Sequence, residues 1–218
     1  MAIPRKSLAH VAASAVLASL VLLPIASKNV GAQSPAVEIP ELPPPTAGSF
    51  SLVDHTGRSV TDKDFRGAYL LIYFGYTFCP DVCPTGLQAM SDAIDLLGRQ
   101  GNAVQPIFVS VDPDRDTAEV MADYVDFFHP RLRGLTGTSE QVAAAAKGYG
   151  VRYFKLYYPS FGDDDDQGDD AENTDYAVSH SAFTYLVGPD GRGLATFAHG
   201  TWPEDLAREI RRHLDTAS

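Results

Sequence analysis

The sequence has few cysteines, few basic residues and no long apolar run. Only 2 of its 218 residues are cysteine, and both lie in one short segment, at Cys79 and Cys83. A network of disulfides therefore cannot hold the chain together. With 44% hydrophobic residues, the chain can instead bury a core of its own. This composition suits one domain of moderate size with short appendages.

Basic residues are outnumbered by acidic ones. The chain has 17 lysines and arginines against 28 aspartates and glutamates, and its net charge is −11 at pH 7. Residues 1–32 contain three of the basic residues and no acidic one, so without them the net charge would be −14. Nucleic-acid binding depends on a basic surface that contacts phosphates. The sequence therefore excludes nucleic acid as a partner.

The apolar run near the N-terminus is shorter than the roughly 20 residues that span a bilayer comfortably. It covers Val11–Ala26, follows Arg5 and Lys6, and precedes the small residues Val30–Ala32. This order is typical of an export signal. We expect residues 1–32 to be such a signal or an uncleaved anchor, since a short helix can still insert where the bilayer thins. The protein would then be periplasmic or otherwise extracytoplasmic, held at the inner membrane if the anchor is kept.

After a proline-rich linker at residues 33–48, the sequence alternates between strand and helix patterns. Continuous apolar runs predict buried strands, and apolar residues at helical spacing predict helices. The predicted strands cover residues 50–53, 69–74, 104–111, 151–158, 182–187 and 194–198. The predicted helices cover residues 83–97, a segment that begins at Thr117, residues 139–147 and a segment around residues 206–214. This alternation, with a hairpin and a helix at the end, indicates one α/β sandwich domain over residues 49–216.

The chemistry of the chain is concentrated where the strand at 69–74 enters the segment GYTFCPDVCPTG. If Cys83 lies in the first turn of the next helix and Cys79 just before it, the two sulfurs converge on one side. The helix dipole and the free amides there favour negative charge, so both sulfurs are expected to be partly ionised. Such a pair can form a reversible disulfide or bind a soft metal. The spacing alone leaves both uses open.

A metal site needs a further ligand, and the spacing of the 6 histidines does not single one out. His180 stands in a polar stretch just before the strand at 182–187, but a lone histidine is more often structural or merely exposed. Zinc is the rival metal. Structural zinc takes four protein ligands, and the sequence has no HExxH motif or CxxC pair to supply them. If His180 were the third ligand, two sulfurs and one nitrogen would suit copper better than zinc.

Four segments, in this order, closely resemble the SCO/SenC family of copper chaperones: YFGYTFCPDVCPTGLQAM, VSVDPDRDT, FHPRLRGLTGTSEQ and DYAVSHSAFTYLVGPDGR. The resemblance covers about residues 48–214. It implies a thioredoxin-like, three-layer α/β sandwich with a central mixed sheet and an N-terminal β-hairpin extension. It also implies that Cys79, Cys83 and His180 bind one copper ion per chain, as Cu(I) or Cu(II). The family often has aspartate just before this histidine, where the present chain has Ser179.

The resemblance implies a metallochaperone that delivers copper to the CuA site of cytochrome c oxidase subunit II or to a related respiratory enzyme. An upstream copper donor would load it. The alternative is a thiol–disulfide reductase that keeps the cysteines of the acceptor reduced, with Cys79 and Cys83 as the redox-active pair. A metal site needs His180, whereas thiol–disulfide exchange does not.

Other residues near these segments allow two interpretations each. The loop that contains Asp112, Arg115 and Asp116 follows a buried strand, and it could serve function or simply form a turn and cap a helix. Tyr76, Phe78 and Asp81 could form a docking surface or support the fold. The acidic run at residues 163–170 could collect metal or contact a partner, but it is expected to be a solvated insertion, because such a composition cannot form a core.

Overall fold

The computed structural model describes residues 48–157 and 176–216. Residues 1–47, with the expected export segment and linker, lie outside the described residues, and so does the acidic run at 163–170. Within the described ranges, no helix is long and apolar enough to cross a membrane. The predictions for the export segment and the acidic run therefore stay predictions.

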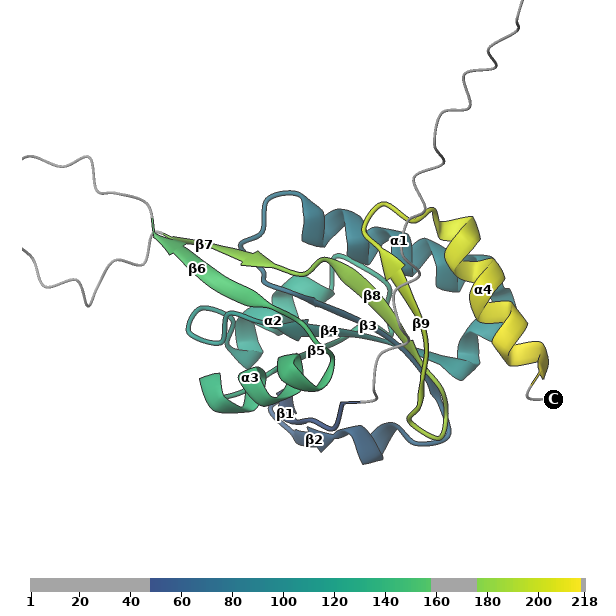
Figure 1. Cartoon of the computed structure of the whole chain (residues 1–218), viewed down its shortest axis with the longest axis horizontal. Coiled ribbons are helices and arrows are strands. Elements are labelled where there is room, and N and C mark those ends of the chain that lie inside the picture. Colours follow the sequence, from purple (N-terminus) through teal and green to yellow (C-terminus); the bar gives the residue numbers. More distant parts are fainter. Residues whose placement is uncertain (1–47, 158–175, 217–218) are drawn as a thin grey trace, which may run out of the picture. The chain divides into compact units, whose positions relative to one another are not determined.

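Seven strands form one mixed sheet in the order β2-β1-β5-β4-β3-β8-β9 (Figure 1). The two continuous apolar runs of the sequence are its central, parallel strands β3 and β4, and side chains on both of their faces are buried. Strand β8 pairs antiparallel with β3, which makes the sheet mixed. The strands are β1 (Ser51–Asp54), β2 (Ser59–Thr61), β3 (Tyr69–Gly75), β4 (Val104–Ser110), β5 (Arg133–Thr136), β8 (Phe183–Val187) and β9 (Gly193–Ala198).

The first two strands form the predicted N-terminal hairpin. Strand β1 pairs antiparallel with β2 on one side and with β5 on the other, so the hairpin extends the sheet at its edge. The buried carboxylate of Asp54 closes the turn, because it accepts hydrogen bonds from the backbone amides of Thr56 and Arg58, both at 3.0 Å. This local bonding explains why the short segment DHTG turns the chain so sharply.

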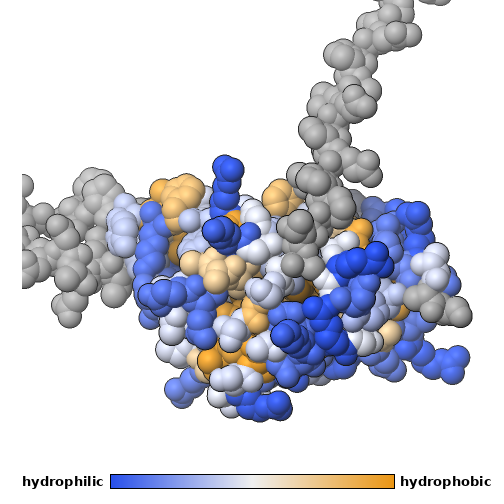
Figure 2. All heavy atoms as spheres, turned by 60° about the horizontal axis from the view of Figure 1, so that its bottom comes forward, coloured by the Kyte–Doolittle hydropathy of each residue, from blue (hydrophilic) through white to orange (hydrophobic). Residues whose placement is uncertain are grey.

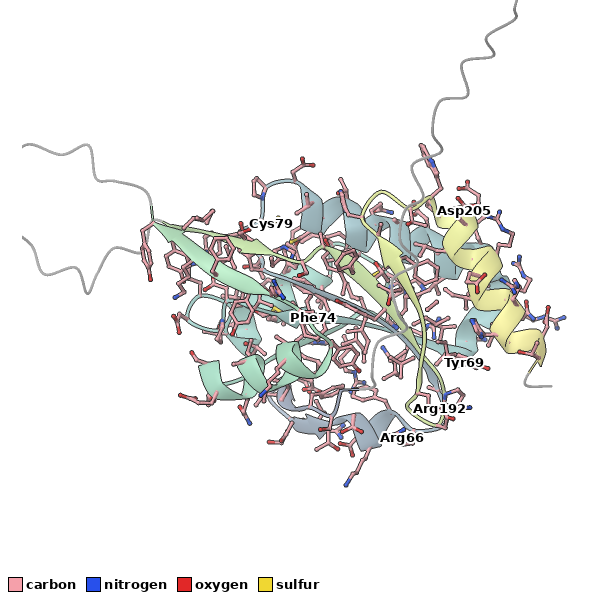
Figure 3. All side chains as sticks on the ribbon, in the orientation of Figure 1. Arg66, Tyr69, Phe74, Cys79, Arg192 and Asp205 are labelled. Atoms are coloured by element: carbon pink, nitrogen blue, oxygen red, sulfur yellow. The ribbon has the colours of Figure 1, made fainter. Side chains whose placement is uncertain are left out.

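Helices cover both faces of the sheet and complete the three layers. Helices α1 and α4 pack together on one face, and α3 lies on the other (Figure 1). Phe74 lies between the layers (Figure 3), with its ring centroid 5.3 Å from that of Tyr149 at the end of α3. The thioredoxin-like sandwich is thus confirmed. The helices are η1 (Asp62–Phe65), α1 (Val82–Leu97), η2 (Gly98–Ala103), α2 (Ala118–Val125), α3 (Ser139–Gly148) and α4 (Pro203–Thr216).

A separate two-stranded sheet projects from this sandwich (Figure 1). It pairs β6 (Tyr153–Tyr157) antiparallel with β7 (Tyr176–His180). The sequence predicts β6 but not β7. His180 does lie just before a strand, β8, as expected, and it is also the last residue of β7, where it pairs with Tyr153.

The surface around the N-terminal hairpin is mostly hydrophilic, as expected for a strongly charged chain. In the view that brings this side forward, apolar residues occupy small, separate areas (Figure 2). Single exposed apolar residues are normal on a soluble surface, whereas apolar side chains gathered around a hollow indicate binding. The latter arrangement occurs elsewhere in the molecule, beside α1.

Candidate metal centre

The cysteine segment forms a tight loop between β3 and α1. Helix α1 begins at Val82, so Cys83 lies in its first turn and Cys79 just before it, as the sequence predicts. Close packing at the end of β3 requires glycine at position 75. A Cβ atom on Gly75 would lie 2.7 Å from Cys83 Sγ and 2.9 Å from the Phe108 ring. The last residue of the strand therefore has no side chain, which leaves room for the buried sulfur of Cys83.

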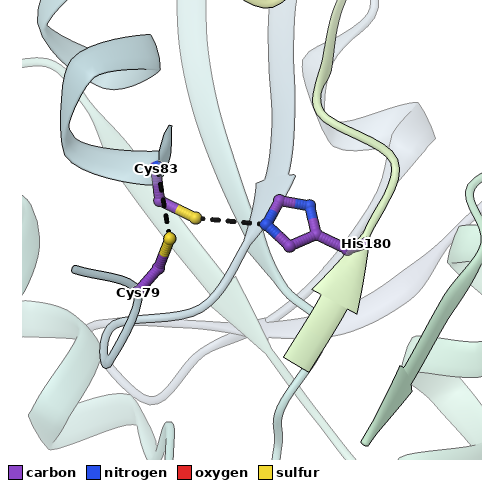
Figure 4. A group of neighbouring side chains, drawn as sticks. All are labelled: Cys79, Cys83 and His180. Atoms are coloured by element: carbon purple, nitrogen blue, oxygen red, sulfur yellow. Dashed lines mark hydrogen bonds between the residues drawn. The ribbon is translucent and has the colours of Figure 1, made fainter. Parts of the chain in front are cut away.

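The fold brings His180 to this sulfur pair across 97 residues of sequence. Its Nε2 atom lies 3.3 Å from Cys83 Sγ, and the ligand atoms of Cys79, Cys83 and His180 all lie within 4.8 Å of one another (Figure 4). The other ring nitrogen, Nδ1, lies 3.1 Å from the carbonyl oxygen of Ser181. With the proton on Nδ1 donated to this carbonyl, the lone pair of Nε2 faces the sulfurs.

Two tyrosine rings hold the imidazole from the side of the sheet. Tyr73 and Tyr76 each meet the His180 ring edge to face, at centroid distances of 6.3 and 5.9 Å and interplanar angles of 86° and 90°. The Tyr73 hydroxyl donates to the carbonyl oxygen of Val82 at 3.2 Å, which ties the same ring to the start of α1. Burial of Tyr73 raises the pKa of its hydroxyl, so this group stays a hydrogen-bond donor.

The two thiols differ in charge. The hydrogen bond from the Cys83 thiol lowers the pKa of Cys79 to about 4, with help from the backbone amides of Asp81 and Cys83. The same hydrogen bond, together with burial, raises the pKa of Cys83. These opposite shifts favour one thiolate beside one thiol, whereas the sequence suggested two partly ionised sulfurs. Binding of a metal by both sulfurs would release the remaining proton.

A buried carboxylate, that of Asp116, holds the cysteine loop in place by hydrogen bonds. Asp116 accepts hydrogen bonds from the backbone amide of Thr77 at 3.1 Å, from the Thr77 hydroxyl at 2.6 Å and from the Ser110 hydroxyl at 2.6 Å. Burial raises its pKa above the usual value, and these hydrogen bonds oppose the change. The sequence predicts helix capping by Asp116 or Thr117, and the cap is Thr117, whose side chain accepts from the Val120 amide at the start of α2.

A second buried carboxylate holds the strand that carries the histidine. Asp112 accepts hydrogen bonds from the Tyr176 hydroxyl and from Arg115 Nε, both at 2.6 Å. The Arg115 guanidinium also donates to the Tyr176 carbonyl and lies over three rings, 3.7 Å from the Tyr176 centroid, 4.8 Å from that of Phe78 and 5.8 Å from that of Tyr76. Arg115 thus links β7 to the cysteine loop. Sequence reasoning missed Tyr176, although it lies four residues before His180 and so on the same face of the strand.

The residues that flank the cysteines differ in burial. Tyr76 is buried and supports the imidazole, whereas Phe78 is 61% exposed and Asp81 is also exposed. Ser179 precedes His180 on β7, so its side chain points to the opposite face of the strand. The orienting contact that a neighbouring acid could provide comes here from the Ser181 carbonyl.

Two sulfurs and one imidazole nitrogen form a soft ligand set with three members. Thiolates prefer Cu(I), and imidazole accepts copper in either oxidation state. Three ligands leave a further coordination position free, and His180 is only half-buried whereas Cys83 is buried. The arrangement is therefore suited to hold copper and to admit one more ligand.

The chain matches the SCO1/SenC family over residues 40–215. It is 43% identical to protein sco1 of Schizosaccharomyces pombe over 168 residues, which are 77% of this chain and 60% of that protein. It is 42% identical to the human mitochondrial SCO1 homolog over 173 residues, 78% of this chain and 54% of that protein. The chain thus spans little more than half the length of these relatives.

Solved structures show the same fold. ScoI of Bradyrhizobium japonicum, solved with copper bound, superposes with a TM-score of 0.65 at 38% identity, over 77% of this chain and 98% of that one. Yeast Sco1, also with copper bound, gives a TM-score of 0.66 at 32% identity, over 79% and 90% of the two chains. Because the family match covers residues 40–215 and these relatives align with most of the chain, the chain belongs to the SCO1/SenC family.

Proposed function

We propose that the chain is a copper metallochaperone for cytochrome c oxidase assembly and that Cys79, Cys83 and His180 bind one copper ion as its cargo. The observation that supports this most is the convergence of three soft ligand atoms within 4.8 Å, from segments far apart in the sequence. Copper-bound structures of two relatives support the choice of metal. Copper is the metal that this ligand set prefers.

Transfer proceeds by ligand exchange without a change in oxidation state. A thiolate or imidazole of the acceptor adds to Cu(I) at the free coordination position, and the bond to Cys79, the less buried sulfur, breaks first. The bonds to His180 and Cys83 then break in turn, while further acceptor ligands replace them. Cys83 loses its proton when copper binds and regains it when copper leaves. Charge and protons therefore balance over the cycle.

The acceptor in this proposal is the CuA site of cytochrome c oxidase subunit II or of a related respiratory enzyme, and an upstream donor supplies the copper. Residues 1–32 export the chain or anchor it to a membrane, and residues 33–48 link this segment to the copper-binding domain at 49–216. The mitochondrial location of the human SCO1 relative supports a site of action outside the cytoplasm.

The test is a titration of the whole reduced chain with Cu(I) against a competing chelator. We expect one tightly bound equivalent, which then moves to the copper-free soluble domain of the oxidase subunit. Absence of any binding tighter than that of the Cys79→Ser, Cys83→Ser double variant would refute the proposal.

The reductase function is the second candidate, because the Cys79 thiolate lies beside a thiol that can close a disulfide with it. Exchange with a disulfide of the acceptor would survive His180→Ala, whereas copper binding would be strongly weakened. Loss of disulfide exchange in His180→Ala would count against this second function.

A further inference from the structure

A groove of about 530 Å³ lies between α1 and the segment that joins β9 to α4. Its lining is largely apolar and includes Tyr73, Ala89, Ala198, Trp202 and Leu206. A hollow of this size accommodates a few side chains of a partner.

Tyr73 belongs both to the lining of the groove and to the surroundings of the candidate metal centre. The Tyr73 ring lines the groove and also meets the imidazole of His180 edge to face at 6.3 Å. Asp81, which also lines the groove, is only two residues from Cys79 in the sequence. A polypeptide segment bound in the groove would therefore reach the position where a fourth ligand can approach the copper.

The charge of the groove is negative. Asp81 and Asp92 line it, and in the described part of the chain neither carboxylate forms an ion pair. Among the described residues, no lysine or arginine lines the groove, and His199 is its one basic side chain. The whole chain carries a net charge of −11. Charge complementarity thus favours an occupant with positive charge and disfavours a second copy of this chain.

Trp202 stands at the edge of the groove with 72% of its surface exposed, and it is the only tryptophan of the chain. Its backbone is held in place, because its carbonyl accepts the amides of Asp205 and Leu206 in the first turn of α4. The preceding Thr201 hydroxyl donates to the Ala198 carbonyl at 2.8 Å. An exposed indole on a fixed backbone beside an apolar hollow has the character of a binding hot spot.

We infer that this groove is the docking site for the partner that exchanges copper with the chain. The inferred occupant is a polypeptide segment that places an apolar side chain against Trp202 and Leu206 and a flanking lysine or arginine near Asp92. This inference rests on the proposed function, since it assumes that copper passes to another protein. Docking here keeps the partner's own ligands next to Cys79 while transfer takes place.

The experiment compares Trp202→Ala with Phe127→Ala. Phe127 is a matched control, because it is 80% exposed and does not line the groove. The probe is the copper-free soluble domain of the oxidase subunit, and the readout is the rate of Cu(I) transfer at subsaturating acceptor. We expect Trp202→Ala to slow transfer at least about 10-fold, as loss of a hot-spot tryptophan does. Phe127→Ala should transfer at the wild-type rate, and both variants should keep the wild-type affinity for copper.

A second variant tests the charge of the occupant. Asp92→Asn should slow transfer roughly 2- to 5-fold at low salt and reduce its dependence on ionic strength, because rim charges act mainly on association. Mixing with the acceptor domain should also shift the fluorescence of Trp202 in the wild-type chain.

Wild-type transfer rates in Trp202→Ala, together with unchanged fluorescence on mixing, would overturn the docking site and leave the chaperone function intact. A wild-type chain that binds no copper would overturn the proposed function itself.

Discussion

The cysteine loop and the antiparallel pair of strands β6 and β7, here called the β6–β7 hairpin, both contribute ligands to the candidate metal centre. The rest of the protein holds the two segments in place in different ways. The loop begins at the central strand β3, ends in α1, and rests on the buried carboxylate of Asp116. The hairpin forms a sheet of its own, and most positions of β6 are exposed or half-buried. Figure 3 shows this difference in position, with Cys79 beside the sandwich and the hairpin extending beyond it.

The candidate metal centre therefore has two halves. One half, the two sulfurs, is held firmly by the core, and the other half, the imidazole of His180, is attached separately through the β6–β7 hairpin. The sulfurs belong to the core of the domain, so their position depends on the packing of the whole fold. The imidazole depends on a few side-chain contacts, chiefly the hydrogen bonds of Tyr176 with Asp112 and Arg115. Changes in the two halves should therefore have different consequences.

The largest expected effect is the loss of copper affinity when a ligand is removed, and it should differ between a sulfur ligand and the imidazole. Cys83→Ser should weaken Cu(I) binding by more than roughly 1000-fold, well beyond the 10- to 100-fold typical of a lost outer-shell partner. His180→Ala should weaken it by about 100-fold, and added imidazole should restore part of the loss because Tyr73 and Tyr76 leave a slot for the ring. Competition with a Cu(I) chelator measures both.

His199→Ala is the control for this comparison, because His199 does not belong to the ligand cluster. Equal rescue of the Cys83 and His180 variants by imidazole would contradict the division into two halves.

The second largest effect concerns the hydrogen bond that attaches the β6–β7 hairpin to the domain. Tyr176→Phe removes the hydroxyl that donates to Asp112 but keeps the ring under Arg115. We expect copper affinity to fall about 10-fold, as for other lost outer-shell contacts, with unchanged reactivity of the two thiols. Tyr157→Phe is the matched control, since Tyr157 is exposed and its ring contacts Tyr176. Equal affinities in the two variants would show that the hydrogen bond does not position His180.

The smallest effect on copper binding concerns Asp116. Asp116→Asn leaves one of the three donated hydrogen bonds without a good acceptor, and the variant should lose about 1–3 kcal/mol of unfolding free energy. Denaturant unfolding measures the loss, and Asp123→Asn on the exposed face of α2 serves as control. A drop in affinity larger than that of Tyr176→Phe would show that the loop is held less firmly than the hairpin.

The core elements could be predicted from the sequence because their signals are local. The helix expected at 139–147 occurs at Ser139–Gly148, and the one expected at 83–97 begins one residue earlier, at Val82. No residue range for β2, β5 or β7 was predicted from the sequence, and the hairpin that contains β2 was implied by family resemblance alone. Strands β2 and β5 are short, with three and four residues, and they are defined by pairing with β1 and, for β5, with β4 rather than by an apolar run of their own.

The sequence by itself determined the two sulfurs, their place at the start of a helix and, through family resemblance, the identity of the histidine. Those features are local, or they are carried by motifs that can be read directly. Only the tertiary structure decided that His180 ends a strand, that Tyr176 and Arg115 hold this strand, and that an acidic groove with Trp202 lies against Tyr73. Such relations join residues tens of positions apart, and only the folding of the whole domain brings them into contact.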